Sequence, residues 1–356
     1  MNKIAKQKYY NIQNIIKEDC EYNVLLGERS NGKSYQVKDY CINDYLENGN
    51  KLIYLRRYTV EIKNAMVESY FADVDISKKT KGKYELIVAY RSSIYLANYN
   101  DDGTINRGVE IGKMMALSSS THYKSMSLLE FKNIIFEEFI TDDGYLFNEP
   151  NTLQQLVSTI ARRNRIKVFL IGNTISRLCP YFNEWQLFNI PKQKQGTIEI
   201  YNMSTDQYDE TGKRVVIKIG VELCENSGNN SKMFFGTVSK TITNGAWETK
   251  EQPHIPYEYK ECKCLYKLTI IKFNMIYICE VLNHKSDYFV FVHPSNKVAT
   301  ARVIQDNYEP NMLITDKLIP LTKGDTLILK LFKMGKICYS DNLTGSEFSK
   351  SVLQTL

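Results

Sequence analysis

The sequence has few of the residues that build metal sites or disulfide frameworks. Among 356 residues, four are histidine and eight are cysteine. The cysteines are scattered, and the nearest pair, Cys262 and Cys264, has neither the spacing nor the partner pair of a zinc site. We therefore expect reduced thiols and no structural zinc.

Long apolar runs are also missing. None approaches the roughly 18 residues that a membrane-spanning helix needs, and the basic start "MNKIAKQKYYNIQN" lacks the apolar core of a secretory signal. We find no internal repeat and no low-complexity segment. These absences predict a cytoplasmic protein without a membrane partner, and 43% hydrophobic and 24% charged residues argue against wholesale disorder. A net charge of +6 permits a polyanionic partner without requiring one.

The length favours two domains, and the pattern of the chain changes along its course. In residues 1–191, short apolar strands alternate with helical stretches, which is typical of an α/β domain with a mostly parallel sheet covered on both faces. Residues 192–255 are polar, with glycine and asparagine clusters, and are interpreted as a linker or a small subdomain. Residues 256–356 contain β-rich runs and predict a second, smaller domain.

A phosphate-binding loop follows the first apolar strand. The pattern G-x-x-x-x-G-K-S stands between a strand and a helix, where backbone N–H groups can surround the phosphates of ATP. The predicted nucleotide-binding residues are Gly27, Glu28, Arg29, Ser30, Asn31, Gly32, Lys33 and Ser34. Lys33 would meet the β- and γ-phosphates, and the Ser34 hydroxyl would bind Mg2+.

Two glutamates end the apolar strand "NIIFEEF". Glu137 is expected to hold hydrated Mg2+, although aspartate is the usual residue there, and Glu138 to polarise the attacking water. Asn173, at the end of "VFLIGNT", is a candidate contact to the γ-phosphate. In "ARRNR", Arg162 and Arg163 could neutralise the charge of the transferring phosphoryl group, often from a neighbouring subunit.

These motifs leave more than one function open. A water-activating glutamate favours ATP hydrolysis, but a small-molecule P-loop kinase and a nucleotide-gated scaffold without hydrolysis remain alternatives.

The segments "GERSNGKSY", "IYLRRY", "NIIFEEFI", "RNR", "IGN", "PYF" and "PNMLIT" extend over most of the chain. With them the chain resembles the DNA-packaging ATPase, or encapsidation protein, of small short-tailed phages of the Picovirinae, a compact relative of the terminase large subunit. The resemblance implies an ASCE, RecA-like P-loop ATPase domain and a C-terminal domain of degenerate RNase H-like fold. It also implies an ATP-driven translocase that packages double-stranded DNA into the procapsid.

The resemblance further implies roles for particular residues and partners. Lys124 and one of Arg162 and Arg163 would act on the neighbour's nucleotide. Pore-lining candidates for DNA are Arg56, Arg57 and Lys63, although Thr59 stands where a pore lysine is expected. The expected assembly is a homo-oligomeric ring, a pentamer by resemblance, docked on the portal protein in the host cytoplasm and absent from the mature virion. Use of a packaging RNA is left open. Glu280 and Asp287 are the nearest candidates for nuclease carboxylates, and no nuclease activity is expected.

Overall fold

The structure is a computed structural model in which the chain forms two compact units. The described residues are 10–27, 31–124, 126–141, 145–162, 164–172, 179–208, 210–225, 251–272, 275–298, 300, 303–305 and 322–353. The first unit holds the elements from helix α1 (Gln13–Lys17) to strand β9 (Arg214–Leu223). The second holds those from the 3-10 turn η5 (Tyr259–Glu261) to helix α9 (Asn342–Ser351).

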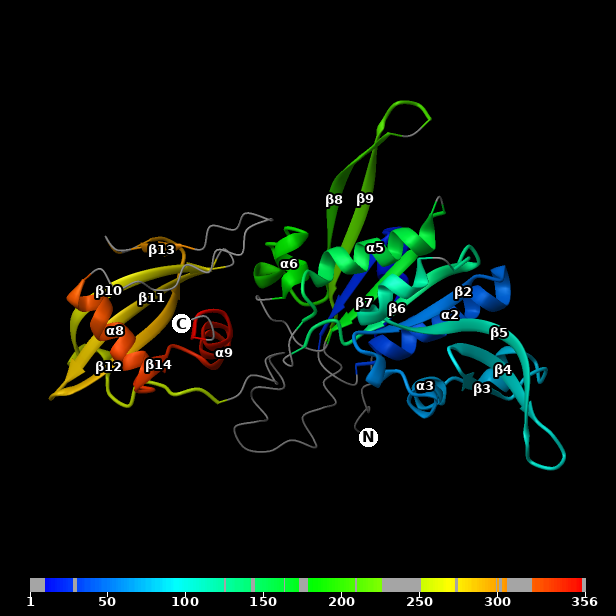
Figure 1. The fold of residues 1–356 in the computed structure, drawn as a ribbon, viewed down its shortest axis with the longest axis horizontal. Helices are drawn as coiled ribbons and strands as arrows, with labels where there is room; N and C mark the ends of the chain where they lie inside the picture. The colour runs from blue at the N-terminus through cyan, green and yellow to red at the C-terminus, as the bar shows by residue number, and fades with distance from the viewer. Residues whose placement is uncertain are drawn as a thin grey trace, which may run out of the picture. The chain divides into compact units, whose positions relative to one another are not determined.

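The first unit is built on a nine-stranded sheet in the order β3-β4-β5-β2-β6-β7-β1-β9-β8 (Figure 1). The remaining strands are β1 (Tyr22–Leu26), β2 (Lys51–Arg56), β3 (Leu86–Tyr90), β4 (Ser93–Tyr99), β5 (Ile105–Ala116), β6 (Phe131–Glu137), β7 (Lys167–Gly172) and β8 (Thr197–Tyr208). The six strands from β5 to β9 in this order run parallel, and the outer strands are antiparallel. Since β7 alone separates β1 from β6, the phosphate loop and the two glutamates lie at one sheet edge. The predicted α/β P-loop architecture is confirmed.

Helices cover both faces of this sheet. They are α1, α2 (Lys33–Asn48), α3 (Asn64–Phe71), α4 (Ile76–Lys79), α5 (Glu149–Ala161) and α6 (Pro180–Glu184), with 3-10 turns η1 (Thr59–Glu61), η2 (Leu117–Tyr123) and η3 (Ile190–Lys192). Helix α2 ends where the sequence predicts. Gly49 has a φ of +74°, and its N–H donates to the carbonyl of Tyr45 at 2.8 Å, which is a left-handed glycine cap.

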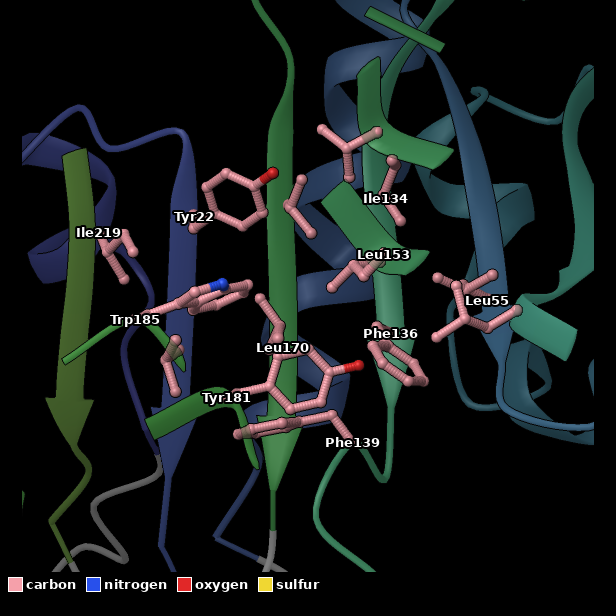
Figure 2. Close-up of a cluster of buried hydrophobic side chains, with 14 of the residues drawn as sticks. Tyr22, Leu55, Ile134, Phe136, Phe139, Leu153, Leu170, Tyr181, Trp185 and Ile219 are labelled. Carbon is pink, nitrogen blue, oxygen red and sulfur yellow. The ribbon is translucent and has the colours of Figure 1, made fainter. Parts of the chain in front are cut away.

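Two apolar clusters explain why the central strands are apolar throughout. Successive strand residues face opposite sides of a sheet, so Val24 and Leu26 belong to one cluster and Leu25 to the other. Figure 2 shows part of the first cluster, where the ring of Trp185 packs 5.1 Å from Tyr22, between centroids. The second cluster packs against α1, α2 and α3. Both faces are therefore buried, as a doubly covered parallel sheet requires.

The prediction of a linker or subdomain over 192–255 is wrong for residues 197–223. Strand β9 pairs in parallel with β1, in a register that sets Glu222 opposite Leu25, and β8 pairs with β9. The five residues that end β9 are buried, whereas the outer part of the hairpin is largely exposed and extends beyond the rest of the sheet (Figure 1). Because this exposed part is rich in polar residues, the composition of the whole segment is polar. Residues 226–250 lie outside the described part of the chain.

The second unit is a five-stranded mixed sheet in the order β13-β10-β11-β12-β14. Its elements are β10 (Lys263–Lys272), β11 (Met275–His284), β12 (Asp287–Ser295), β13 (Val303–Gln305), α8 (Lys323–Lys333), β14 (Ile337–Tyr339) and α9. Ile328 of α8 and Phe348 of α9 complete its buried core. The smaller β-rich α+β domain is thereby confirmed.

Two expectations based on absences can be compared with the structure. All eight cysteines lie in the described part of the chain, and none forms a disulfide. Within the described ranges, no helix has both the length and the apolar character needed to cross a membrane.

Candidate functional site

The phosphate loop leaves β1 through two glycines in unusual backbone conformations. A Cβ added to Gly27, whose φ is +158°, would come 3.2 Å from Nδ2 of Asn31 and 3.3 Å from the Cβ of Cys224. Gly32 has a φ of +95° and forms the N-cap of α2. Both positions favour glycine, and the N-terminus of α2 follows directly, at a place where helices commonly bind anions.

Side chains in this loop are suited to an anion. Lys33 is buried, with 3% exposure, and its backbone N and its Nζ each lie 3.2 Å from Oδ1 of Asn31. Nδ2 of Asn31 is buried and lacks a hydrogen-bond partner among the described residues. A buried amide donor without an acceptor is costly, and a phosphate oxygen would satisfy it. The loop therefore fits a nucleotide phosphate.

Glu137, the last residue of β6, lies beside the start of α2. Its carboxylate accepts hydrogen bonds from the Ser34 hydroxyl and from the Tyr70 hydroxyl, the latter at 2.7 Å. Burial raises the pKa of Glu137, while these two donors and the nearby charge of Arg56 oppose the shift. A hydroxyl and a carboxylate are oxygen ligands of the kind that Mg2+ prefers. Ser34 and Glu137 thus fit the predicted metal pair.

Glu138 follows with its backbone in the left-handed region, at a φ of +54°. This conformation is unfavourable for a residue with a Cβ. The side chain is 51% exposed, and Oε2 lies 2.7 Å from Nη2 of Arg56. Arg56, which the resemblance assigns to DNA, therefore lines the candidate nucleotide site and pairs with the predicted catalytic carboxylate.

These groups line one cavity of about 450 Å3 at the carboxyl edge of the sheet. Its lining includes Lys33, Ser34, Arg56, Tyr70, Glu137 and Glu138. The volume is in the usual range for small-molecule sites. The residues predicted to bind phosphate, to bind metal and to activate water thus line one cavity, and they come from the start of α2 and the end of β6.

Arg57, predicted to contact DNA, is buried in this structure. Its Nε and Nη2 lie 2.8 and 3.0 Å from the two carboxylate oxygens of Glu149. Nη2 also donates to the carbonyl of Phe139 at 2.6 Å, and Nη1 to that of Glu138 at 3.2 Å. The guanidinium thereby holds the backbone on which Glu138 is carried.

Three predicted residues lie on the surface outside the cavity. Lys63 is exposed and forms the N-cap of α3. Lys124 is exposed and follows η2, while Arg162 is exposed and ends α5. Nη2 of Arg162 donates to the carbonyl of Met126 at 3.2 Å, which brings Arg162 close to the Lys124 segment. Neither Lys124 nor Arg162 lines the cavity of its own chain.

Five predicted residues belong to parts of the chain that are not described. They are Glu28, Arg29, Ser30, Arg163 and Asn173.

Sequence reasoning missed Tyr70, Tyr10 and Glu222. Tyr10 donates from its backbone N–H to the carbonyl of Asn31 at 3.0 Å and from its hydroxyl to Oε2 of Glu222 at 2.7 Å. Burial raises the pKa of Glu222 to about 7. The alternation in "VVIKIGVEL" could have indicated strand β9. No local pattern marks Tyr70, whose partner Glu137 is 67 residues away.

In the described part of the second unit, the two candidate nuclease carboxylates each pair with a lysine. Glu280 pairs with Lys267, Nζ to Oε1 at 2.5 Å, and Asp287 pairs with Lys336, Nζ to Oδ1 at 3.0 Å. Among described residues, no group of three or more histidine, cysteine, aspartate or glutamate side chains could hold a metal ion.

Such a parallel sheet, with a glycine-flanked phosphate loop and two carboxylates at its edge, defines a P-loop NTPase domain. The chain belongs to the podovirus DNA encapsidation protein family (Gp16), whose sequence profile matches residues 4–207.

Similar proteins agree with this membership. The DNA packaging protein of Bacillus phage phi29 is 31% identical over 201 residues, 55% of each chain. That of Bacillus phage B103 is 27% identical over 261 residues, 65% of this chain and 75% of the relative. The match to the phi29 protein thus spans about half of that protein's length. The structure of the phi29 viral genome packaging motor assembly is 24% identical, covers 94% of this chain and 95% of that chain, and has a TM-score of 0.50, which supports the fold.

Proposed function

We propose that this protein is an ATP-driven motor that translocates double-stranded viral DNA through the portal into the procapsid. Membership of the encapsidation family supports this role. The observation that carries it is the convergence of the phosphate loop with Glu137 and Glu138 in one cavity. Together they supply phosphate binding, metal binding and water activation, which ATP hydrolysis needs.

The chemistry follows from where each group lies. Lys33, the amide of Asn31 and the N-terminus of α2 bind and orient the phosphates. Ser34 and Glu137 would hold Mg2+, which would supply positive charge to offset that of the phosphates. Glu138 accepts a proton from the attacking water. Arg56 engages Oε2 of Glu138, so the contact to the water falls to the other oxygen of this half-exposed carboxylate.

Neighbouring subunits complete the site in this proposal. Lys124 and Arg162 are exposed, are near each other and lie outside their own chain's cavity. A cation supplied in trans stabilises charge on the transferring phosphoryl group. Arg163 is the alternative to Arg162. The assembly is a ring, a pentamer by resemblance, which works on the procapsid in the host cytoplasm and leaves before the virion matures.

DNA contact requires a cation that is free to reach the phosphates. Arg56 and Arg57 are engaged by Glu138 and Glu149, whereas Lys63 is exposed beside the exposed side chain of Val60. We assign the phosphate contact to Lys63 and its flanking segment. The second unit serves as a binding domain for portal, DNA or packaging RNA.

A steady-state ATPase assay with and without double-stranded DNA tests this function. DNA should stimulate hydrolysis by the parent chain. Lys33→Ala should lose ATP binding, and Glu138→Gln should keep binding but lose about 10²–10⁴-fold in turnover because an amide is no base. Parent-like turnover in Glu138→Gln would refute the assigned roles, and a parent that neither binds nor hydrolyses ATP would refute the function.

A further inference from the structure

Tyr70 connects the metal-binding carboxylate to a helix that carries none of the motif residues. It lies in α3, and its hydroxyl donates to Oε1 of Glu137 at 2.7 Å. Its ring packs 4.7 Å from Tyr54 and 5.0 Å from Phe71, between centroids. The side chain is therefore held by packing on both sides, and its hydroxyl is aimed at the carboxylate.

The same end of α3 is fastened to the helix that follows the phosphate loop. Lys38 lies one turn after Ser34 in α2, so both side chains are on the same side of that helix. Nζ of Lys38 donates to the carbonyl of Tyr70, pairs with Asp73 and lies 4.6 Å from the centre of the Tyr70 ring. The C-terminal end of α3 thus contacts elements that carry both predicted metal-binding residues.

The opposite end of α3 faces solvent. Lys63 forms its N-cap and is exposed, and Met66 in its first turn is 48% exposed. An eight-residue helix is about 12 Å long at 1.5 Å per residue, and its hydrogen-bonded backbone connects Tyr70 to the Lys63 end. A displacement of Tyr70 would accordingly be transmitted to Lys63.

We propose that the Tyr70 hydroxyl couples nucleotide binding at Glu137 to DNA binding at the Lys63 end of α3. This inference rests on the proposed function and names how its site is regulated. An O–H···O bond holds only at about 2.5–3.0 Å between oxygens. If Glu137 turned to hold Mg2+, Tyr70 would have to follow for this bond to persist, and α3 would move with it. Tyr70 is thus a positioning residue rather than a catalytic one.

Four affinities test this coupling without relying on turnover. The affinity of the full chain for Mg2+ with the non-hydrolysable nucleotide AMP-PNP is measured by calorimetry with and without a DNA duplex. The affinity for a fluorescent duplex is measured by anisotropy with and without the nucleotide. The affinities with and without the other ligand give two ratios, one for the nucleotide and one for DNA. Linkage requires that these two ratios be equal. In the parent chain we expect a change of about 5-fold or more, the lower range of measured couplings.

The decisive variant is Tyr70→Phe, which removes one oxygen and keeps the ring packing. In this variant both affinity ratios should lie within about twofold of one, whereas the parent ratios should be about 5 or more. Tyr208→Phe is the matched control, because Tyr208 is 66% exposed at the end of β8 and does not line the cavity, and it should keep the parent ratios. Circular dichroism checks that both variants fold.

Two outcomes for Tyr70→Phe would overturn the inference alone. One is a variant with unchanged ratios and unchanged affinities. The other is a variant whose nucleotide affinity falls while the ratio stays at the parent value, because Tyr70 would then only support the metal site. A parent that binds both ligands with a ratio of one would also overturn it. A parent that binds no nucleotide would overturn the proposed function as well. The calorimetric titration of the parent detects this outcome before any variant is compared.

Discussion

The ion pair between Arg57 and Glu149 should make a large contribution to the stability of the first unit. Glu149 is 1% exposed, and its two oxygens accept from Arg57, from the Tyr181 hydroxyl at 2.8 Å and from the backbone N–H of Leu146 at 2.8 Å. Glu149→Gln keeps the size of the side chain but replaces one acceptor with a donor. It also leaves the buried guanidinium without its counter-charge.

The expected loss follows from this geometry. Removing one partner of a buried pair costs about 3–5 kcal/mol. For a unit of this size, each kcal/mol shifts the melting temperature by about 2–4 °C, so the shift should be roughly 6–20 °C. Tyr181→Phe removes one donor only and should cost about 1.5–3 kcal/mol, the value of a hydrogen bond to a charged group.

The assay must report on the first unit, because two units need not unfold together. The fluorescence of Trp185 does so, since its ring packs 5.2 Å from that of Tyr181, provided the other tryptophan is removed by Trp247→Phe. Asp19→Asn is the control. Asp19 pairs with Arg165 and with Lys167 at the surface, and its loss should cost under about 1 kcal/mol. If Glu149→Gln melts within the range of this control, the reasoning about the buried pair is refuted.

Three further predictions concern Glu222, the second unit and the subunit interface. Burial raises the pKa of Glu222 from 4.5 to about 7, so the folded chain keeps a proton that the unfolded chain releases, and stability should fall as pH rises through this window. Glu222→Gln should reduce the difference between urea midpoints at pH 5 and pH 8, and an unchanged difference would contradict this. The full chain should not cleave DNA with Mg2+ or Mn2+; cleavage abolished by Glu280→Gln would show that the domain is a nuclease. Rings mixed from Glu138→Gln and Arg162→Ala subunits should exceed either variant in ATPase activity, because the first donates its arginine to the intact site of the second. No gain on mixing, with both variants assembled, would rule out Arg162 in trans.

The parts of the site that are local in sequence could be predicted. Gly32, Lys33 and Ser34 follow one another at the turn between β1 and α2, and a strand end fixes where Glu137 lies. Contacts between distant segments could not be predicted, because the sequence does not show which side chains meet. Tyr70 is such a case. Strand β9 escaped notice for another reason, since its exposed outer half masks the buried inner half in any average over the segment.

The adjacent arginines of "YLRRY" occupy different environments in the structure. Neighbouring residues at a strand end point in different directions, so Arg56 reaches the carboxylate of Glu138 and Arg57 the buried carboxylate of Glu149. Both guanidinium groups nevertheless contact Glu138, the predicted catalytic residue, because Arg57 also donates to its carbonyl. Gripping DNA with Arg57 would break a buried pair at a cost of several kcal/mol, and gripping it with Arg56 would release Glu138. A DNA contact made by Lys63 avoids both costs, and it leaves the two arginines to control where Glu138 points.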